Sequence, residues 1–389
     1  MNRRYFVSLC IAIIFPNVVY SVEPISEQEC VNGLSNKEID LTSHFSPIKD
    51  QGPNSVYCSP FAVTALAEEL ACNNKLSFCG KSLSTLDVAG CLWPEIGLGL
   101  SSSDGRILGR SSNPAALMSC VSNQSGICEE SIAPYRSSRG ASWMNLLFRP
   151  DPNNSYREVF NQFESACRTF RSRRCASCMQ NSNLSDEQES QLLRDLVDLQ
   201  EYLAKNFDQA SGLSLSQMRR SFEESCSFDS NSGSNTEQNR NVFLKKILLP
   251  EACEKQRIKI FLNHDIQIET YQPPLVERFL GLSPNSSDLP HSKEIRIQTL
   301  SQIKTGLKKN ESSILTFCVG FKNKACFGAH SIVVAGIRWH EGSGCQLLLR
   351  NSWGEDAARF QGWVSIDGRT SDRAVIDFAM EVSRWSVKE

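Results

Sequence analysis

The sequence predicts an α+β protein whose helices and strands occupy different parts of the chain. Residues 151–290 contain several charged segments with helical spacing, such as "DEQESQLLRDLVDLQEYLAKNF". The last quarter instead contains short apolar runs such as "HSIVVAGIRW" and "CQLLLRNSW", which are typical of buried strands. Because 389 residues exceed one average domain, we expect either two lobes or one fold that carries an insertion.

The first segment, residues 1–21, predicts a secretory signal peptide. A basic start with Arg3 and Arg4 precedes an apolar stretch, and small residues suited to cleavage follow it. An uncleaved membrane anchor is the alternative, but Pro16 and Asn17 interrupt the stretch and leave it too short to span a bilayer comfortably. We therefore expect an exported protein, secreted or periplasmic, with no membrane segment after cleavage.

Three further segments complete the predicted organisation. Residues 22–150 contain an extended "IDLT" and a helix over 59–73, which is apolar nearly all round and therefore suits a buried position. Residues 151–292 predict a helical, cysteine-containing insertion. Residues 293–389 predict a β-rich lobe, which begins with the amphipathic helix "IQTLSQIKTGLKKN" and continues with strands in "SSILTFCVGF", "HSIVVAGIRW", "CQLLLRNSW" and "GWVSID".

Charge and cysteine usage narrow the classes of function. The net charge is −2 and becomes −4 without the two arginines of the leader, and no basic patch indicates a nucleic-acid partner. The chain has 16 cysteines, and loss of Cys10 with the leader leaves 15, which an exported chain should pair as disulfides with one thiol left over. The segment 151–292 holds five of them, so at least one disulfide should join it to the rest of the chain.

One short motif raises the question of a metal. "CASC" at 175–178 could be half of a zinc or redox site, but no second pair stands at a matching spacing. Disulfides are the favoured interpretation of these two cysteines. We therefore predict no metal and no cofactor.

Cys58 is the first candidate for chemistry. It stands directly before Ser59 and Pro60, a pair suited to the N-cap and first turn of the buried helix. A thiol at this end of a helix is exposed to the positive pole of the helix dipole, which favours the thiolate and predicts a lowered pKa. The alternative is a disulfide between Cys58 and Cys72 or Cys79.

His330 and Asn351 are the second and third candidates. His330 opens a predicted strand in "GAHSIVVAGIRW", and Asn351 ends another in "LLLRNSWGE", with Trp353 beside it. An asparagine amide can hold an imidazole in one orientation and tautomer, and an indole can keep water away from that hydrogen bond. A structural histidine and an ordinary turn with a packed tryptophan are the alternatives.

These segments together resemble the papain-like cysteine peptidases. The likeness lies in the order and local pattern of "SPIKDQG", "CSPFAVTALAE", "GAHSIVVAGIRW" and "LLLRNSWGE", and it covers roughly residues 40–135 and 293–370. It implies a two-lobe fold, with a helical lobe and an antiparallel β-barrel-like lobe, into which a helical, disulfide-rich subdomain is inserted. In that family histidine and asparagine follow the cysteine by about 130–150 residues. Here they follow Cys58 by 272 and 293 residues, and the segment 151–292 accounts for the excess.

The resemblance implies an exported peptidase that hydrolyses peptide bonds in a polypeptide substrate. Cys58 would attack the carbonyl as a thiolate, and His330 would protonate the leaving amine as an imidazolium. Asn351 would orient His330 under the cover of Trp353. Gln51 and the backbone amide of Cys58 would bind the developing oxyanion.

The family pattern is broken near the nucleophile. Gln51 and Cys58 stand one residue further apart than in the family, so an ungapped alignment puts Tyr57 in the place of the nucleophile. Phe61 and Glu68, three and ten residues after Cys58, match the family's phenylalanine and glutamate only if Cys58 is the nucleophile. We therefore favour Cys58.

Two other functions share these residues. In the position after the nucleophile, where the family has tryptophan, this chain has Ser59, so a catalytically inactive homologue acting as an extracellular binding module is an alternative. Acyl transfer or cross-linking through the same thiol is another. In either case, residues 151–292 could bind a protein partner or inhibit the cleft.

Overall fold

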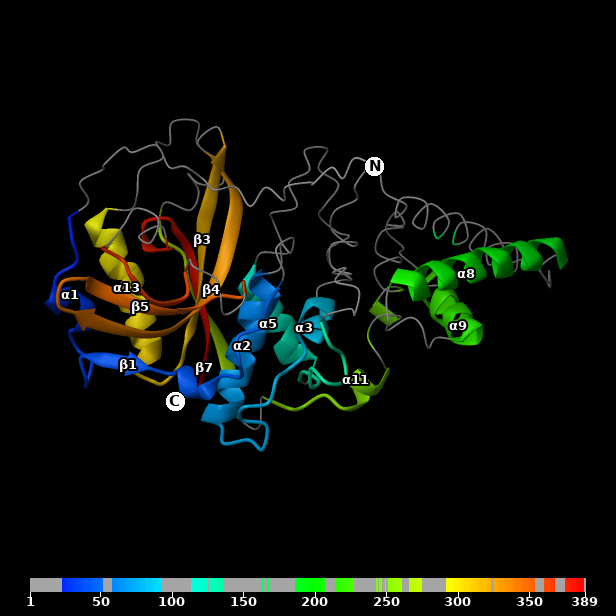
Figure 1. The fold of residues 1–389 in the computed structure, drawn as a ribbon, viewed down its shortest axis with the longest axis horizontal. Helices are drawn as coiled ribbons and strands as arrows, with labels where there is room; N and C mark the ends of the chain where they lie inside the picture. The colour runs from blue at the N-terminus through cyan, green and yellow to red at the C-terminus, as the bar shows by residue number, and fades with distance from the viewer. Residues whose placement is uncertain are drawn as a thin grey trace, which may run out of the picture. The chain divides into compact units, whose positions relative to one another are not determined.

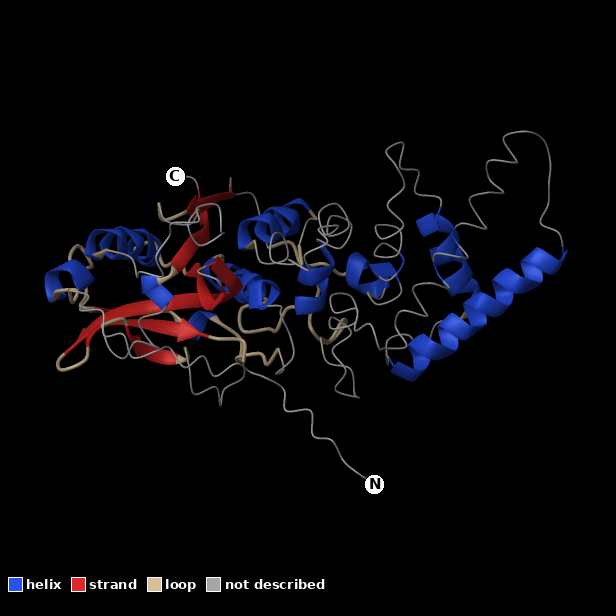
Figure 2. Cartoon of the chain, turned by 90° about the horizontal axis from the view of Figure 1, so that it is seen from above, coloured by secondary structure: helices blue, strands red, loops and turns tan. Residues whose placement is uncertain are grey.

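A computed structural model shows an α+β protein with an antiparallel sheet and several helices (Figure 1). The chain divides into two compact units, of which the first comprises residues 1–83, 108–127 and 258–389 and the second residues 84–107 and 128–257. Every described strand belongs to the first unit (Figures 1 and 2). The structure describes residues 23–51, 58–91, 113–124, 126–135, 163, 167, 186–206, 214–226, 243, 245–246, 249, 251–260, 266–274, 292–322, 325–353, 360–367 and 375–387.

The sheet of the first unit has the strand order β2–β7–β3–β4–β5–β6, and β1 pairs with β4. All of these pairings are antiparallel. The strongly apolar runs form the central strands, whose inward side chains are almost fully buried. The strands are β1 (Glu38–Asp40), β2 (Ile266–Tyr271), β3 (Ser313–Lys322), β4 (Ala325–His340), β5 (Gly344–Arg350), β6 (Gly362–Ser365) and β7 (Ala379–Val387).

Helices of the first unit pack against this sheet. The predicted buried helix is α2 (Cys58–Asn73), which contacts β4 and β3 and is buried on nearly all sides, as its sequence predicts. The predicted amphipathic helix is α13 (Lys293–Leu307), which contacts β7, β4 and β3. The other described helices of this unit are α1 (Glu27–Val31), the 3-10 turn η1 (Thr42–His44) and α5 (Pro114–Asn123).

The second unit contains helices and turns among its described residues. Its helices are α3 (Thr85–Cys91), α8 (Asp186–Asn206), α9 (Leu215–Cys226) and α11 (Glu251–Lys255). α8 and α9 contact each other, and both run over the residues that the sequence predicts as helical. Phe222 of α9 forms an aromatic cluster with Phe163 and Phe243, with ring centroids 4.9–6.2 Å apart, so these three buried rings form a small apolar core in the second unit.

Two strands were missed by the sequence analysis. β2 lies within residues 151–292, which we predicted as helical, and it pairs with β7, which we did not predict. The alternation of "IQIE" is typical of a strand, but six residues, none of them fully buried, give a weak signal beside long charged helices. The correction is that residues 266–271 belong to the sheet of the first unit.

Disulfides connect distant parts of the chain, as predicted. The pairs are Cys30–Cys345, Cys72–Cys79, Cys128–Cys253 and Cys167–Cys226, and Cys91, Cys120 and Cys318 are also disulfide-bonded. The bridge between Cys128 and Cys253 confirms that a disulfide joins the segment 151–292 to another part of the chain. These bonds are consistent with an oxidising compartment.

In the described residues, none of the helices is both long and apolar enough to cross a membrane. Several predictions fall outside the described residues: the leader 1–21, Tyr57 and the "CASC" motif at 175–178.

Candidate functional site

Cys58 is the first residue of α2, and it is buried. Among the described cysteines it is the one free thiol. The alternative of a disulfide with Cys72 or Cys79 is excluded, because these two cysteines are bonded to each other. Among the cysteines that the structure describes, the free thiol is therefore the one that the motif singles out.

The start of α2 differs from the prediction in one detail. Ser59 was expected as the N-cap, but the helix already begins at Cys58, and Ser59 is a buried residue of the first turn. Pro60 is tolerated there because the first-turn amides have no partner within the helix.

The thiol pKa contradicts the sequence prediction. Burial raises the pKa of Cys58, although hydrogen bonds from Ser331 and Ser59 oppose this rise. The prediction of a lowered pKa counted the helix dipole, which is typically worth about 0.3–1 kcal/mol at a surface. Desolvation of a fully buried anion is the larger effect at this position. Cys58 is therefore a neutral thiol near neutral pH in this structure.

His330 and Asn351 are brought together, although they are 21 residues apart in the chain. The Nε2 atom of His330 lies 2.9 Å from Oδ1 of Asn351, and both residues are buried. Asn351 directly follows β5, as predicted, whereas His330 lies within β4 instead of at its start. The strand begins earlier, at Ala325, because the small residues before His330 also pair with β3.

Trp353 covers the His330 side chain. The two rings are stacked, with centroids 4.5 Å apart, and the indole is partly exposed at 39%. Phe317 contacts the imidazole edge-on at 5.8 Å. The hydrogen bond between His330 and Asn351 is therefore enclosed by aromatic rings, which is the arrangement that the sequence motif predicts.

The hydrogen bond to Asn351 fixes the tautomer of His330. An amide oxygen only accepts, so Nε2 carries the hydrogen and Nδ1 is left as the basic nitrogen. Burial lowers the pKa of His330 from 6.5 to about 4, and the hydrogen bond to Asn351 opposes this shift. The expected imidazolium is thus neutral imidazole at pH 7, and the expected ion pair with Cys58 is absent from this state.

Gln51 is buried on the segment that precedes α2. Its backbone N–H donates to the carbonyl oxygen of Ser352 at 2.7 Å, and its Oε1 accepts from the Ser352 hydroxyl. Asp50 also forms an isolated antiparallel bridge with Trp353. The chain therefore holds Gln51 beside the turn that carries Asn351 and Trp353, and this end of the sheet collects four of the five predicted site residues.

Cys58 interacts with the strand that carries His330 through Ser331, the residue that follows His330. Hydrogen bonds to its thiol come from Ser331 and Ser59. Ser331 has its hydroxyl 3.0 Å from that of Ser59 and 2.9 Å from that of Thr316. This hydroxyl cluster of Ser59, Thr316 and Ser331 has no signal in the sequence, because serine and threonine within apolar segments come together only when the strands pair.

A buried ion pair anchors the segment that carries Gln51. Glu68 of α2 lies 3.0 Å from Nζ of Lys49, and it accepts hydrogen bonds from the hydroxyl of Ser46 and the backbone N–H of Leu83. Glu68 is one of the two residues that supported Cys58 as the nucleophile. Its contacts explain why a carboxylate is needed ten residues into this helix.

A small cavity lies between this segment, α2 and the end of β5, with Lys49, Glu68, Ser331 and Asn351 in its lining. Its volume is about 30 Å³. Since one water needs about 10–15 Å³ by this measure, the cavity holds water-sized groups and no peptide. A polypeptide would have to bind outside it.

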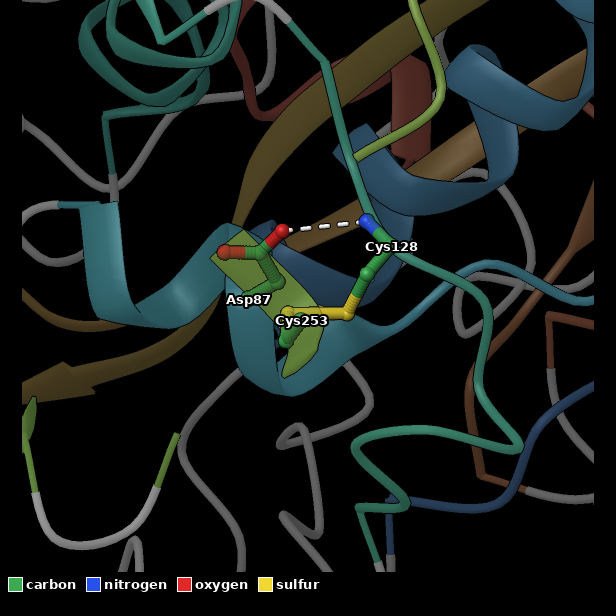
Figure 3. A group of neighbouring side chains, drawn as sticks. All are labelled: Asp87, Cys128 and Cys253. Carbon is green, nitrogen blue, oxygen red and sulfur yellow. Dashed lines mark hydrogen bonds between the residues drawn. A yellow bond between two sulfur atoms is a disulfide. The ribbon is translucent and has the colours of Figure 1, made fainter. Parts of the chain in front are cut away.

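One group of metal-ligand side chains occurs in the described residues, in the second unit. Asp87, Cys128 and Cys253 lie together, but the two sulfurs are bonded to each other (Figure 3). Asp87 accepts from the backbone N–H of Cys128 and pairs with Arg257 at 2.8 Å. With the sulfurs and the carboxylate engaged in this way, the group serves the fold of the second unit and offers no ligand set.

No protein-family model and no curated protein matches the chain. Among solved structures, SERA5E from Plasmodium falciparum is 13% identical with a TM-score of 0.40, and the match covers 92% of this chain and 98% of that one. PepW from Lactobacillus rhamnosis is 14% identical with a TM-score of 0.39, and the match covers 92% of this chain and 83% of that one. Both TM-scores are below 0.5.

Proposed function

We propose that this chain is an exported, papain-like cysteine peptidase, secreted or periplasmic, that hydrolyses peptide bonds in polypeptide substrates. In this proposal the nucleophile is Cys58, the base is His330, and the fold has the two lobes of that family with the segment 151–292 added. The observation that carries it is the enclosed hydrogen bond between His330 and Asn351, in the same unit as the free thiol.

The pKa directions favour a neutral resting pair over a preformed ion pair. His330 presents Nδ1 as its basic nitrogen, so it can take the thiol proton as the sulfur attacks the peptide carbonyl. The resulting imidazolium then gives its proton to the leaving amine, and the same nitrogen activates the water that cleaves the thioester. Asn351 keeps the ring in this tautomer through both steps, as the orienting residue of a triad does.

The oxyanion would be held by Gln51 and the backbone amide of Cys58. The Ser352 hydroxyl donates a hydrogen bond to Oε1 of Gln51, which fixes the orientation of the Gln51 side-chain amide. Nε2 is then the donor end of that side chain. The backbone amide of Cys58 lies at the start of α2, where helix amides have no partner within the helix. Loss of one such donor typically costs about 2.7–4 kcal/mol of transition-state stabilisation.

A catalytically inactive binding module is the second candidate, and one observation favours it. Burial keeps Cys58 protonated and His330 neutral, so neither carries the charge that typifies an activated pair. In that case the segment 151–292 would provide the contacts to a protein partner. Acyl transfer through the same thiol is a third use of the same residues.

A peptidyl epoxide that alkylates activated thiols separates these functions. We expect it to label Cys58 in the folded protein, and mass spectrometry of the digested protein locates the label. His330→Ala should reduce the labelling rate at least about 100-fold, because a general base contributes about 10²–10⁴. His340→Ala is the matched control, since His340 is an exposed histidine at the other end of β4, and this variant should label like the wild type.

Peptide turnover completes the test. A mixture of quenched fluorescent peptides should be cleaved by the wild type and by His340→Ala, but not by Cys58→Ser. Cys58 that reacts only after denaturation would refute the peptidase and support the binding module. A labelled Cys58 that transfers acyl groups to added amines without hydrolysing peptides would support the third function.

A further inference from the structure

The buried hydroxyl cluster of Ser59, Thr316 and Ser331 lies next to both candidate catalytic residues. Ser59 follows Cys58 in the first turn of α2, and Ser331 follows His330 in β4. Their hydroxyl oxygens are 3.0 Å apart. A direct contact thus joins the residue after the candidate nucleophile to the residue after the candidate base.

The sheet holds the cluster in place. Thr316 and Ser331 are directly paired across β3 and β4, with their hydroxyl oxygens 2.9 Å apart. Directly paired residues of antiparallel strands project from the same face, and α2 contacts both strands. Ser59, Thr316 and Ser331 are each at most 5% exposed, so water does not compete for their hydrogen bonds.

The cluster has one more hydroxyl hydrogen than its own contacts use. Three hydroxyl groups carry three hydrogens, and the two oxygen–oxygen contacts use two of them. The remaining hydrogen points out of these two contacts. Beyond the cluster, Ser59 and Ser331 hydrogen-bond to the Cys58 thiol through both their side chains and their backbone amides.

We propose that Ser331, supported by Ser59 and Thr316, is a positioning residue that donates a hydroxyl hydrogen bond to the Cys58 sulfur when the thiol loses its proton. The role rests on the proposed function, in which Cys58 is the nucleophile. The cluster would fix the sulfur relative to β4, and it would stabilise the anion at a place that water does not reach.

Two features of the site fit this role. Burial opposes ionisation of Cys58, and the hydrogen bonds from Ser331 and Ser59 are the contributions that work against it. In the papain-like pattern the residue after the nucleophile is tryptophan, which cannot donate to the sulfur through a hydroxyl. Serine at position 59 therefore exchanges an apolar neighbour for a polar one that is bonded to the histidine strand.

The test measures the pH dependence of Cys58 alkylation by iodoacetamide in the intact protein. In Ser331→Ala we expect the midpoint to move to higher pH and the rate at pH 7 to fall about tenfold, the loss expected for one hydrogen bond to a charged group. Ser383→Ala is the matched control, because it removes a buried hydroxyl of the same sheet that bonds to Glu381. The control should keep the wild-type profile.

Further variants guard against a loss of folding. Ser59→Ala and Thr316→Val should shift the profile in the same direction as Ser331→Ala, while Thr316→Ser keeps a hydroxyl and should retain the wild-type profile. Because the cluster acts as one unit, the Ser59→Ala, Ser331→Ala double variant should lose no more than about the larger single loss. Folded variants with a wild-type profile, or losses that multiply in the double variant, would overturn the proposal.

Peptide hydrolysis measured in parallel separates this inference from the proposed function. A shifted alkylation profile in a protein that cleaves no peptide would keep the hydroxyl donation to Cys58 and refute the peptidase. Peptide cleavage with an unshifted profile in Ser331→Ala would keep the peptidase and refute the role of Ser331.

Discussion

Glu69 on α2 is the group whose ionisation should affect the stability of the fold most clearly. Its carboxyl group accepts the backbone N–H of Ser312 at 3.0 Å and the Ser312 hydroxyl at 2.7 Å, and the residue is 3% exposed. Burial raises the pKa of Glu69 from 4.5 to about 8, and the nearby Glu311 raises it further, while the bonds from Ser312 and the charge of Arg350 oppose the rise. The folded protein therefore keeps a proton that the unfolded chain releases.

The sign and size of the pH effect on the free energy of unfolding follow from proton linkage. The unfolded chain loses its proton above pH 4.5 and the folded protein only near pH 8, so the stability due to the protonated Glu69 is complete below pH 4.5 and is lost as pH rises through 8. At ~1.4 kcal/mol for each pKa unit, the full loss is about 5 kcal/mol. Glutamine resembles the protonated carboxyl group and does not ionise. Glu69→Gln should therefore remove this loss.

Urea unfolding at pH 5 and pH 9, followed by tryptophan fluorescence, measures the effect. We expect Glu69→Gln to gain about 4 kcal/mol relative to the wild type between these two conditions, because part of the wild-type loss has already occurred at pH 5. The exposed Glu341→Gln is the control and should run parallel to the wild type. Parallel curves for Glu69→Gln and the wild type would show that Glu69 is ionised in the folded protein and would refute the reasoning.

The remaining predictions concern His330 and the disulfides. Because burial lowers the pKa of His330 to about 4, the unfolded chain takes up its proton first as pH falls below 6.5, and stability should drop by about 3 kcal/mol between pH 6.5 and 4. His330→Gln should flatten this part of the urea-derived stability curve, and an unchanged slope would contradict a buried neutral imidazole. Replacing both cysteines of Cys30–Cys345 by alanine should cost about 5–6 kcal/mol and those of Cys72–Cys79 about 2–3, since the loops span 315 and 7 residues. Equal losses in urea unfolding would show that loop entropy is not the main contribution.

Much of the fold could be predicted because burial patterns repeat along the elements. α9 begins and ends at the residues that the sequence predicts, and α8 and α2 agree within a residue. β2 was missed because an edge strand of six residues, none of them fully buried, gives a weak pattern. β7 was missed although it has nine residues, because its sequence "AMEVSRWSV" mixes polar and apolar residues that become buried only when it pairs with β2 and β3. These two strands are identified only by their pairing within the folded sheet.

Some features of the candidate site could likewise be predicted from the sequence, and others could not. The enclosed contact of His330 with Asn351 and Trp353, and the single free thiol among the described cysteines, could be predicted because motif and cysteine parity are properties of the sequence. The direction of the Cys58 pKa was wrong, because desolvation depends on everything that packs around α2. The hydroxyl cluster was missed for the same reason, as only the pairing of β3 with β4 brings its members together.

A neutral resting pair changes what the surrounding residues must do. An ion pair that already exists needs only to be kept in place, whereas a neutral thiol and imidazole must create both charges during the attack. Each hydrogen bond that strengthens as these charges form then lowers the barrier more than it stabilises the resting state. Under the proposed function, Asn351 would stabilise the imidazolium and Ser331 the thiolate, one on each side of the proton transfer. Under the proposed function, these two residues should therefore affect the rate of the chemical step more than the binding of substrate.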